Sequence, residues 1–168
     1  MSNGKTLNVA TPSDTEIVMT RVFDASCGLV FDAYTKPAML RGWLGGAEWT
    51  IDVCEVDLRV GGGYRWTWHN AKGKQIGERG TYREIVPGAR IVAASTFDEP
   101  WYPGNCVETI VFASRGDATA LTTTLRYDTR EARDIALSAG LTRGVTESYE
   151  RLDAVLATST HAEALRAG

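Results

Sequence analysis

The sequence has few of the residues that build metal sites, disulfide frameworks and membrane spans. Among 168 residues there are 3 cysteines and 2 histidines, and 18 apolar residues nowhere run together. Cys27, Cys54 and Cys106 are too scattered for a CxxC motif, and His69 and His161 have no partner at metal-ligand spacing. We therefore expect no metal and no cofactor. Because an odd number of dispersed cysteines is typical of a reducing compartment, we expect a cytoplasmic protein without a leader sequence for export.

Charge of neither sign is concentrated in one part of the chain. The 18 Lys and Arg residues are interspersed with 21 Asp and Glu residues, which gives a formal net charge of −3. The absence of a basic run argues against nucleic acid as a partner and against polybasic attachment or insertion at a membrane. An apolar fraction of 43% and a charged fraction of 23% are typical of globular proteins. At this length we expect a single domain with a sizeable core, spanning residues 1–168.

Three consecutive glycines, Gly61–Gly63, form the most distinctive stretch of the sequence. Glycine permits positive φ and sharp bends that other residues resist. The strand that follows alternates with period two, so three large aromatic residues share one face: Tyr64, Trp66 and Trp68. A bend followed by an aromatic face favours a strongly curved sheet that encloses a cavity.

Alternating apolar residues separated by turn residues predict seven strands. They lie near Glu16–Phe23, Trp49–Leu58, Gly63–His69, Gly77–Val86, Ile91–Asp98, Asn105–Ser114 and Ala118–Tyr127. The short links between consecutive strands indicate an antiparallel meander. We interpret residues 1–14 as a polar leader outside the domain core of about residues 16–157.

Helical periodicity appears after the first strand and again at the end of the chain. Ser26 is a suitable N-cap for a helix over Leu29–Tyr34, and Pro37 suits the first turn of a helix over Pro37–Arg41. A short helix over Glu131–Ala139 precedes a long amphipathic one. The apolar stripe of the long helix contains Leu141, Val145, Tyr149, Leu152, Val155 and Leu156. Residues 158–168 form a polar tail.

Together these elements predict an α+β fold in which a curved antiparallel seven-stranded sheet grips a long C-terminal helix. Two short helices follow the first strand. A curved sheet and a straight helix cannot meet flush everywhere, so we expect a cavity between them.

Several stretches resemble one protein family. They are Thr20–Ala25, Val30–Pro37 with Trp43, Glu55–Gly62, Gly80–Pro87 and Ser148–Leu156. They are similar to bacterial proteins related to the C-terminal domain of the Hsp90 ATPase activator, in the START / Bet v 1-like (SRPBCC) superfamily. The resemblance runs from about Ile17 to Ala157 and implies the helix-grip fold. Because the superfamily includes lipid carriers, polyketide cyclases, lyases and co-chaperones, function must be argued from the site.

Nine aromatic residues are candidates for lining a ligand-binding cavity: Trp43, Tyr64, Trp66, Trp68, Tyr82, Phe97, Trp101, Tyr102 and Tyr149. The alternative is that they fill an ordinary core, because buried aromatic residues dominate core energetics in any domain. Tryptophan and tyrosine also suit a boundary at which one end of the ring needs a polar partner.

Four charged residues are candidate polar groups of the cavity. Glu55, Asp57 and Arg59 share a strand face, where a carboxylate and a guanidinium could orient a ligand, or could form an ion pair that fixes the glycine corner. Asp98 opens an aromatic, proline-containing loop that could cover the mouth of the cavity. It could act there as a general base or be a solvated turn residue. No residue is assigned as catalytic.

Three functions are compatible with these features. The first is the binding of a small hydrophobic or aromatic molecule in the cavity. The second is a cyclase- or lyase-like enzyme that uses the same cavity and whose mark would be a buried polar group with a perturbed pKa, such as Glu55, Asp57, Tyr82 or Asp98. A co-chaperone that binds other proteins comes last, because a single domain lacks the partner domain of the eukaryotic activator. The exposed edge of such a sheet could also pair in a homodimer.

Overall fold

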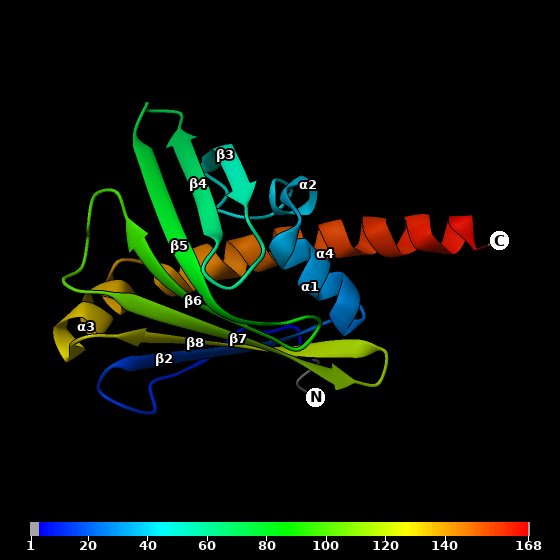
Figure 1. Ribbon diagram of the computed structural model, residues 1–168, viewed down its shortest axis with the longest axis horizontal. Helices are drawn as coiled ribbons and strands as arrows, with labels where there is room; N and C mark the ends of the chain where they lie inside the picture. The colour runs from blue at the N-terminus through cyan, green and yellow to red at the C-terminus, as the bar shows by residue number, and fades with distance from the viewer. Residues whose placement is uncertain (1–3, 168) are drawn as a thin grey trace.

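One antiparallel sheet bends around the long C-terminal helix α4 (Leu141–Arg166), as Figure 1 shows. The computed structural model describes residues 4–167. The strands are β1 (Asn8–Ala10), β2 (Glu16–Phe23), β3 (Trp49–Val56), β4 (Gly63–Asn70), β5 (Gln75–Val86), β6 (Arg90–Phe97), β7 (Cys106–Arg115) and β8 (Ala118–Tyr127). Their order in the sheet is β1-β2-β8-β7-β6-β5-β4-β3. The α+β helix-grip architecture predicted from the sequence is therefore confirmed.

The predicted number of strands was too small by one. Strand β1 lies within the segment interpreted as a leader and pairs with β2, with Asn8 opposite Thr20 and Ala10 opposite Val18. Its three residues are too few to produce a detectable alternation, and all three are exposed. The pairing with β2, not the local sequence, makes this segment a strand. The rest of that leader includes residues 1–3, which lie outside the described part of the chain.

The helices begin and end close to the predicted positions, except that the last one extends further towards the C-terminus. They are α1 (Cys27–Thr35), α2 (Pro37–Leu40), α3 (Arg130–Ser138) and α4. The Ser26 hydroxyl caps α1 by accepting a hydrogen bond of 3.3 Å from the backbone N–H of Leu29. Helix α4 continues to Arg166, so most of the predicted tail is helical, as its alanine content favours. None of the helices within residues 4–167 is long and apolar enough to cross a bilayer.

Glycines near the bend at residues 61–63 have two roles. They allow unusual backbone angles, and they let a neighbouring ring approach the backbone closely. Gly61 has φ of +85°, and a Cβ atom at Gly80 on β5 would lie 2.1 Å from the ring of Tyr64. Only glycine at position 80 therefore lets Tyr64 lie flat against the neighbouring strand. Irregular pairing between Ile51 and Val53 and between Tyr82 and Glu84 adds twist to the same half of the sheet. The aromatic face of β4 is buried on the concave side, as predicted.

Two apolar clusters cover the concave face of the sheet. The larger packs α1, α2 and the middle of α4 against the sheet around Phe23, Val30, Leu40, Leu121 and Leu152. The smaller packs α3 against β2, β7 and β8 and contains Ile17, Met19, Tyr102, Cys106, Leu125, Tyr127, Ala132 and Ala136. Residues of both clusters line the cavity described below.

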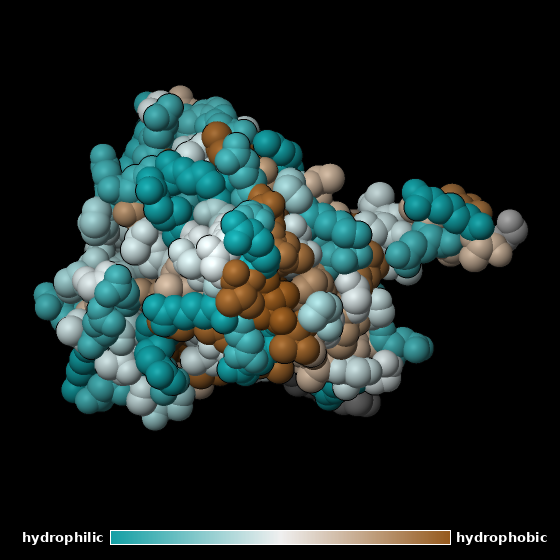
Figure 2. Space-filling view, in the orientation of Figure 1, coloured by the Kyte–Doolittle hydropathy of each residue, from teal (hydrophilic) through white to brown (hydrophobic). Residues whose placement is uncertain are grey.

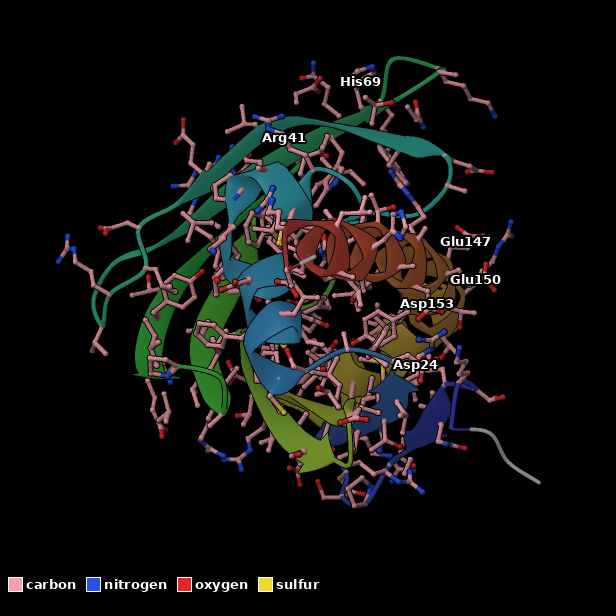
Figure 3. All side chains as sticks on the ribbon, turned by 90° about the vertical axis from the view of Figure 1, so that its right-hand side faces the viewer. Asp24, Arg41, His69, Glu147, Glu150 and Asp153 are labelled. Atoms are coloured by element: carbon pink, nitrogen blue, oxygen red, sulfur yellow. The ribbon has the colours of Figure 1, made fainter. Side chains whose placement is uncertain are left out.

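An ion pair connects α4 to strand β2 of the sheet. The Arg21 side chain on β2 is only 6% exposed, and its guanidinium binds both carboxylate oxygens of Asp153 on α4. Its Nε–H donates to the backbone oxygen of Lys5 at 3.0 Å, and the group lies 4.5 Å from the ring centroid of Phe23. Figure 3 shows Asp153 on the side of α4 turned away from α1. The pair therefore fixes the position of α4 across the sheet.

We expect Asp153→Ala to lower the free energy of unfolding by about 2 to 3 kcal/mol, because it leaves a buried guanidinium without its counter-charge. The loss is smaller than for a fully buried pair, since the Asp153 side chain is 35% exposed. Urea denaturation of the purified variant measures the effect. Glu150→Ala, one turn earlier on the same helix and exposed, is the matched control and should change stability by less than about 0.5 kcal/mol. Equal effects of the two substitutions would contradict this role for Arg21.

Candidate functional site: a cavity between the sheet and the C-terminal helix

A cavity of about 560 Å³ lies between the concave face of the sheet and the N-terminal half of α4. This volume falls in the range of small-molecule sites. Its walls come from strands β2–β8, from α1 and α4, from the loops after α2 and β6, and from the link between α3 and α4. A hollow at α3 is of similar size, but it is lined by α3 and the residue after it alone and is a surface groove. A second, smaller compartment of about 100 Å³ adjoins the main cavity and shares Tyr34, Trp43, Leu44, Glu78 and Glu108 with it.

The predicted aromatic residues are gathered around these two spaces. Six of them line the main cavity: Trp43, Trp68, Phe97, Trp101, Tyr102 and Tyr149. The other three, Tyr64, Trp66 and Tyr82, line the smaller compartment. Three further rings that the sequence did not single out, Tyr34, Trp49 and Tyr127, complete the aromatic walls. Contact of these residues with a ligand remains a prediction.

Hydrogen bonds orient several of the rings. Trp43 Nε1–H donates to the backbone oxygen of Ala33 at 2.9 Å, and Trp68 Nε1–H donates to that of Leu44 at 3.2 Å. The Tyr34 hydroxyl donates to the Tyr149 hydroxyl at 3.1 Å, which joins α1 to α4 at the cavity wall. The rings therefore have fixed positions and present a preformed surface.

The four charged residues predicted to be polar cavity groups lie elsewhere, and that prediction is corrected here. Asp57 and Arg59 form an exposed ion pair with a distance of 2.9 Å beside the glycine corner. Glu55 is exposed on β3. Asp98 is exposed and accepts hydrogen bonds from Arg65 and Arg79, and the Arg65 hydrogen bond lowers the pKa of Asp98. Because Phe97 faces the cavity, strand alternation turns Asp98 to the convex face.

The acids that do face the cavity are Glu78 on β5 and Glu108 on β7. Strand β6 lies between them, and Ser95 on that strand is diagonal to both, because Glu78 pairs with Phe97 and Glu108 pairs with Ala93. Both side chains are half-buried, and the surface that they keep faces the two compartments. The cavity thus combines aromatic walls with two carboxyl groups on its floor, by which we mean the part of the sheet that carries Glu78 and Glu108.

Burial changes the acid–base behaviour of these carboxyl groups. Desolvation raises the pKa of Glu108 to about 7. Desolvation and then the charge of Glu108 raise the pKa of Glu78 to about 8, against the opposing effect of hydrogen bonding from Trp66, Tyr64 and Ser95. Burial also raises the pKa of Cys106 to about 12 and raises the pKa of the tyrosines Tyr34, Tyr64, Tyr82, Tyr102, Tyr127 and Tyr149. Near neutral pH, Glu78 and Glu108 are therefore the groups of the cavity that exchange protons.

The cavity has no cationic lining. Among residues 4–167, those that line it include no lysine, arginine or histidine. Arg151 on α4 reaches its rim only through the backbone oxygen of Gly45, to which it donates at 3.2 Å. No group of three or more His, Cys, Asp or Glu side chains in the described part of the chain is arranged to hold a metal ion. The two carboxyl groups therefore face the space without a counter-charge from a lining residue.

Sequence reasoning missed both acids, although a signal was present. Glu108 has the same strand parity as Cys106, Ile110 and Phe112, which are all buried. An acid on the apolar face of a strand is unusual and marks a functional position. Glu78 was harder to detect, because glycines on both sides, Gly77 and Gly80, remove the apolar alternation around it.

The comparisons with known proteins agree with this architecture. Residues 24–157 match the family described as "Activator of Hsp90 ATPase homolog 1-like protein". The chain belongs to this family. Its fold is that of the START / Bet v 1-like superfamily, as the solved structures of related proteins also indicate.

Three of these structures illustrate the similarity. A Rhodobacter sphaeroides protein is 27% identical, with a TM-score of 0.86 over 90% of this chain and 98% of its own. A Chromobacterium violaceum protein is 28% identical, with a TM-score of 0.70 over 86% of this chain and 98% of its own. A Nitrosomonas europaea protein, 20% identical with a TM-score of 0.80 over 90% of this chain and 99% of its own, shares the fold. No curated protein sequence matches the chain.

The raised carboxyl pKa values predict an unusual dependence of stability on pH. Between about pH 4.5 and pH 7, native Glu108 holds a proton that the unfolded chain has lost, so stability falls as pH rises. For Glu108 this amounts to at most about 3 kcal/mol. We expect Glu108→Gln to be more stable than the parent at pH 8 and to have a flatter profile, as measured by urea denaturation between pH 4.5 and pH 8. The exposed Glu55→Gln variant is the control. Parallel profiles for Glu108→Gln and the parent would show that Glu108 is solvated.

Proposed function

We propose that the protein binds a small hydrophobic or aromatic molecule in the cavity between the sheet and α4. The observation that carries the proposal is the preformed cavity of about 560 Å³ with six of the predicted aromatic residues in its walls. Sites of this size and composition are typical of small-molecule binding. We prefer this function to chaperone binding, because the latter rests on the description of the family alone.

We infer that a ligand enters the cavity beside the aromatic loop after β6. Trp101 is 38% exposed and packs edge-on against Phe97 and Tyr102, at ring-centroid distances of 5.6 and 4.8 Å. Trp101 is therefore partly exposed to solvent and also lines the cavity. Gly45, Gly46 and Gly144 also line the cavity and add no side-chain volume to it.

Filling the cavity from α4 tests the proposal. A Cβ atom at Gly144 would meet no other atom within 4 Å, and the residue lines the cavity. We expect Gly144→Leu to fold well, since leucine favours a helix by about 1 kcal/mol over glycine, and to occupy ligand volume. The affinity for prodan, an uncharged naphthalene fluorophore, should fall about tenfold, which corresponds to about 1.4 kcal/mol.

The matched control is Gly144→Ala, which gains most of the same helix propensity and adds only a methyl group. It should bind prodan within about threefold of the parent. Fluorescence titration gives both affinities. If prodan does not bind the parent, or binds both variants equally, the cavity is not its site and the proposal loses its support.

A second candidate function is favoured by one specific observation. Two carboxyl groups with pKa values of about 7 and about 8 are poised for general acid–base work at neutral pH. In a cyclase- or lyase-like reaction, ionised Glu108 would take a proton from a bound carbon acid, and protonated Glu78 would donate a hydrogen bond or a proton to the developing oxyanion. The aromatic walls would hold the reactant in place.

The proton-transfer half of this function can be measured without the natural substrate. We expect the protein to accelerate exchange of the α-protons of 2-tetralone in D₂O, with a rate that rises as pH increases through about 7 because the base must be ionised. NMR follows the exchange. Glu108→Gln should return the rate to that of buffer, and the exposed Glu55→Gln should not. Exchange at the buffer rate in the parent would remove the support for catalysis.

A further inference from the structure

We propose that the cavity selects hydrophobic molecules that carry a positively charged nitrogen, with Glu78 and Glu108 as the counter-charge. The inference rests on the proposed function and names the ligand class. It is carried by the position of two carboxyl groups in a largely aromatic space whose other polar lining groups are uncharged.

The charges of the lining disfavour the commonest alternative, a hydrophobic anion. A hydrophobic anion, such as a fatty acid or an aryl carboxylate, needs a cation or several N–H donors once it leaves water. The lining residues within 4–167 include two acids and no lysine, arginine or histidine. An anion would meet ionised carboxylates at close range in a space of low polarity, where repulsion is strongest. The same arrangement stabilises a cation.

The carboxylate oxygens of Glu108 can still accept hydrogen bonds from a ligand. Among residues 4–167 no side-chain hydrogen bond to Glu108 is found, and desolvation is the cause of its raised pKa. No side-chain oxygen or nitrogen in the described residues is both fully enclosed and without a hydrogen-bond partner. The Glu108 oxygens therefore retain accessible surface, and that surface faces the cavity. An ammonium group could bind there and supply the missing hydrogen bonds.

The walls suit the remainder of such a ligand. Trp43, Trp68 and Trp101 line the same space, and tryptophan is the ring that attracts cations most strongly. The tyrosine rings of Tyr34 and Tyr149 add two further faces. A ligand with an aromatic body and a short aminoalkyl arm would place its ring among these residues and its nitrogen on the floor.

Proton linkage follows from the groups around Glu108. Those that face it are Tyr34 from α1, Tyr149 from α4, Tyr64 from β4, Glu78 and Tyr82 from β5, Cys106 from β7 and Tyr127 from β8. Burial keeps the tyrosines and Cys106 neutral at pH 7, so binding of an ammonium group is balanced by ionisation of a glutamate. Well below pH 7, where free Glu108 is protonated, one proton therefore leaves the protein for each cation bound, so the affinity for a cation falls as the pH drops below about 7.

Three probes that share an indole ring and a two-carbon arm test the charge preference: tryptamine (cationic), tryptophol (neutral) and indole-3-propionate (anionic). Competition with prodan at pH 7.5 gives their affinities. We expect tryptamine to bind about tenfold more tightly than tryptophol, and indole-3-propionate to bind more weakly than tryptophol. From pH 8 to pH 6 the affinity for tryptamine should fall about tenfold, while that for tryptophol stays constant.

Isosteric variants assign the effect to the floor of the cavity. Glu108→Gln should remove most of the advantage of tryptamine over tryptophol and abolish its pH dependence, and Glu78→Gln should reduce the advantage. Both should keep the affinity for tryptophol within about threefold, which shows that the cavity is intact. Glu55→Gln, exposed on β3, should behave as the parent. Equal binding of the three probes, preference for indole-3-propionate, or an unchanged tryptamine preference in Glu108→Gln would overturn the proposal.

The outcome also separates this inference from the proposed function. If prodan binds and is lost in Gly144→Leu but tryptamine has no advantage, ligand binding stands and the charge selection is wrong. If neither prodan nor any of the three indoles binds, both fail.

Discussion

The distance between α4 and the concave face of the sheet is the constraint on which the site depends. Along the part of the helix that packs closely, the inward side chains are large, with Leu152 and Leu156 almost fully buried. Along the first turns three of the residues that line the cavity, Gly144, Val145 and Ser148, have smaller side chains or none. Because the size of its inward side chains changes along its length, a straight helix fills one half of a curved sheet and leaves a cavity against the other half. The ion pair between Arg21 and Asp153 and the hydrogen bond between Tyr34 and Tyr149 hold the helix in that position.

The fold could be predicted from the sequence because each element carries its own local signal. Strand β2 and strand β8 begin and end at the predicted residues, since uninterrupted apolar alternation ends there in turn residues. Helix α1 is set by Ser26 and α2 by Pro37, both local effects of the backbone. Strand β1 and the last turns of α4 were missed for the opposite reason. Strand β1 depends on pairing with β2. The last turns of α4 depend on helix propensity and have no apolar stripe that would reveal them.

The site was predictable only in part. The aromatic residues could be found because their types and parity are unusual, and all nine line one of the two compartments. Of the two acids, Glu108 carries a signal in the apolar parity of its strand, whereas the glycines around Glu78 remove that signal. Asp98 and Glu55 were chosen for their neighbours in sequence, yet each is turned to solvent. Glu108 and Glu78 come from strands with β6 between them and approach one another only after the sheet has formed.

The two acids share one enclosed space, and this sets the charge that the cavity can carry. Ionisation of either carboxyl raises the pKa of the other, because repulsion between them is poorly screened away from water. Glu108 ionises first, at a pH of about 7, and its charge helps to hold the proton on Glu78 up to about pH 8. Between these values the cavity tends towards one negative charge with one protonated acid beside it. That state can neutralise a single cation and still donate one hydrogen bond, a combination that a pair of permanently ionised acids could not provide.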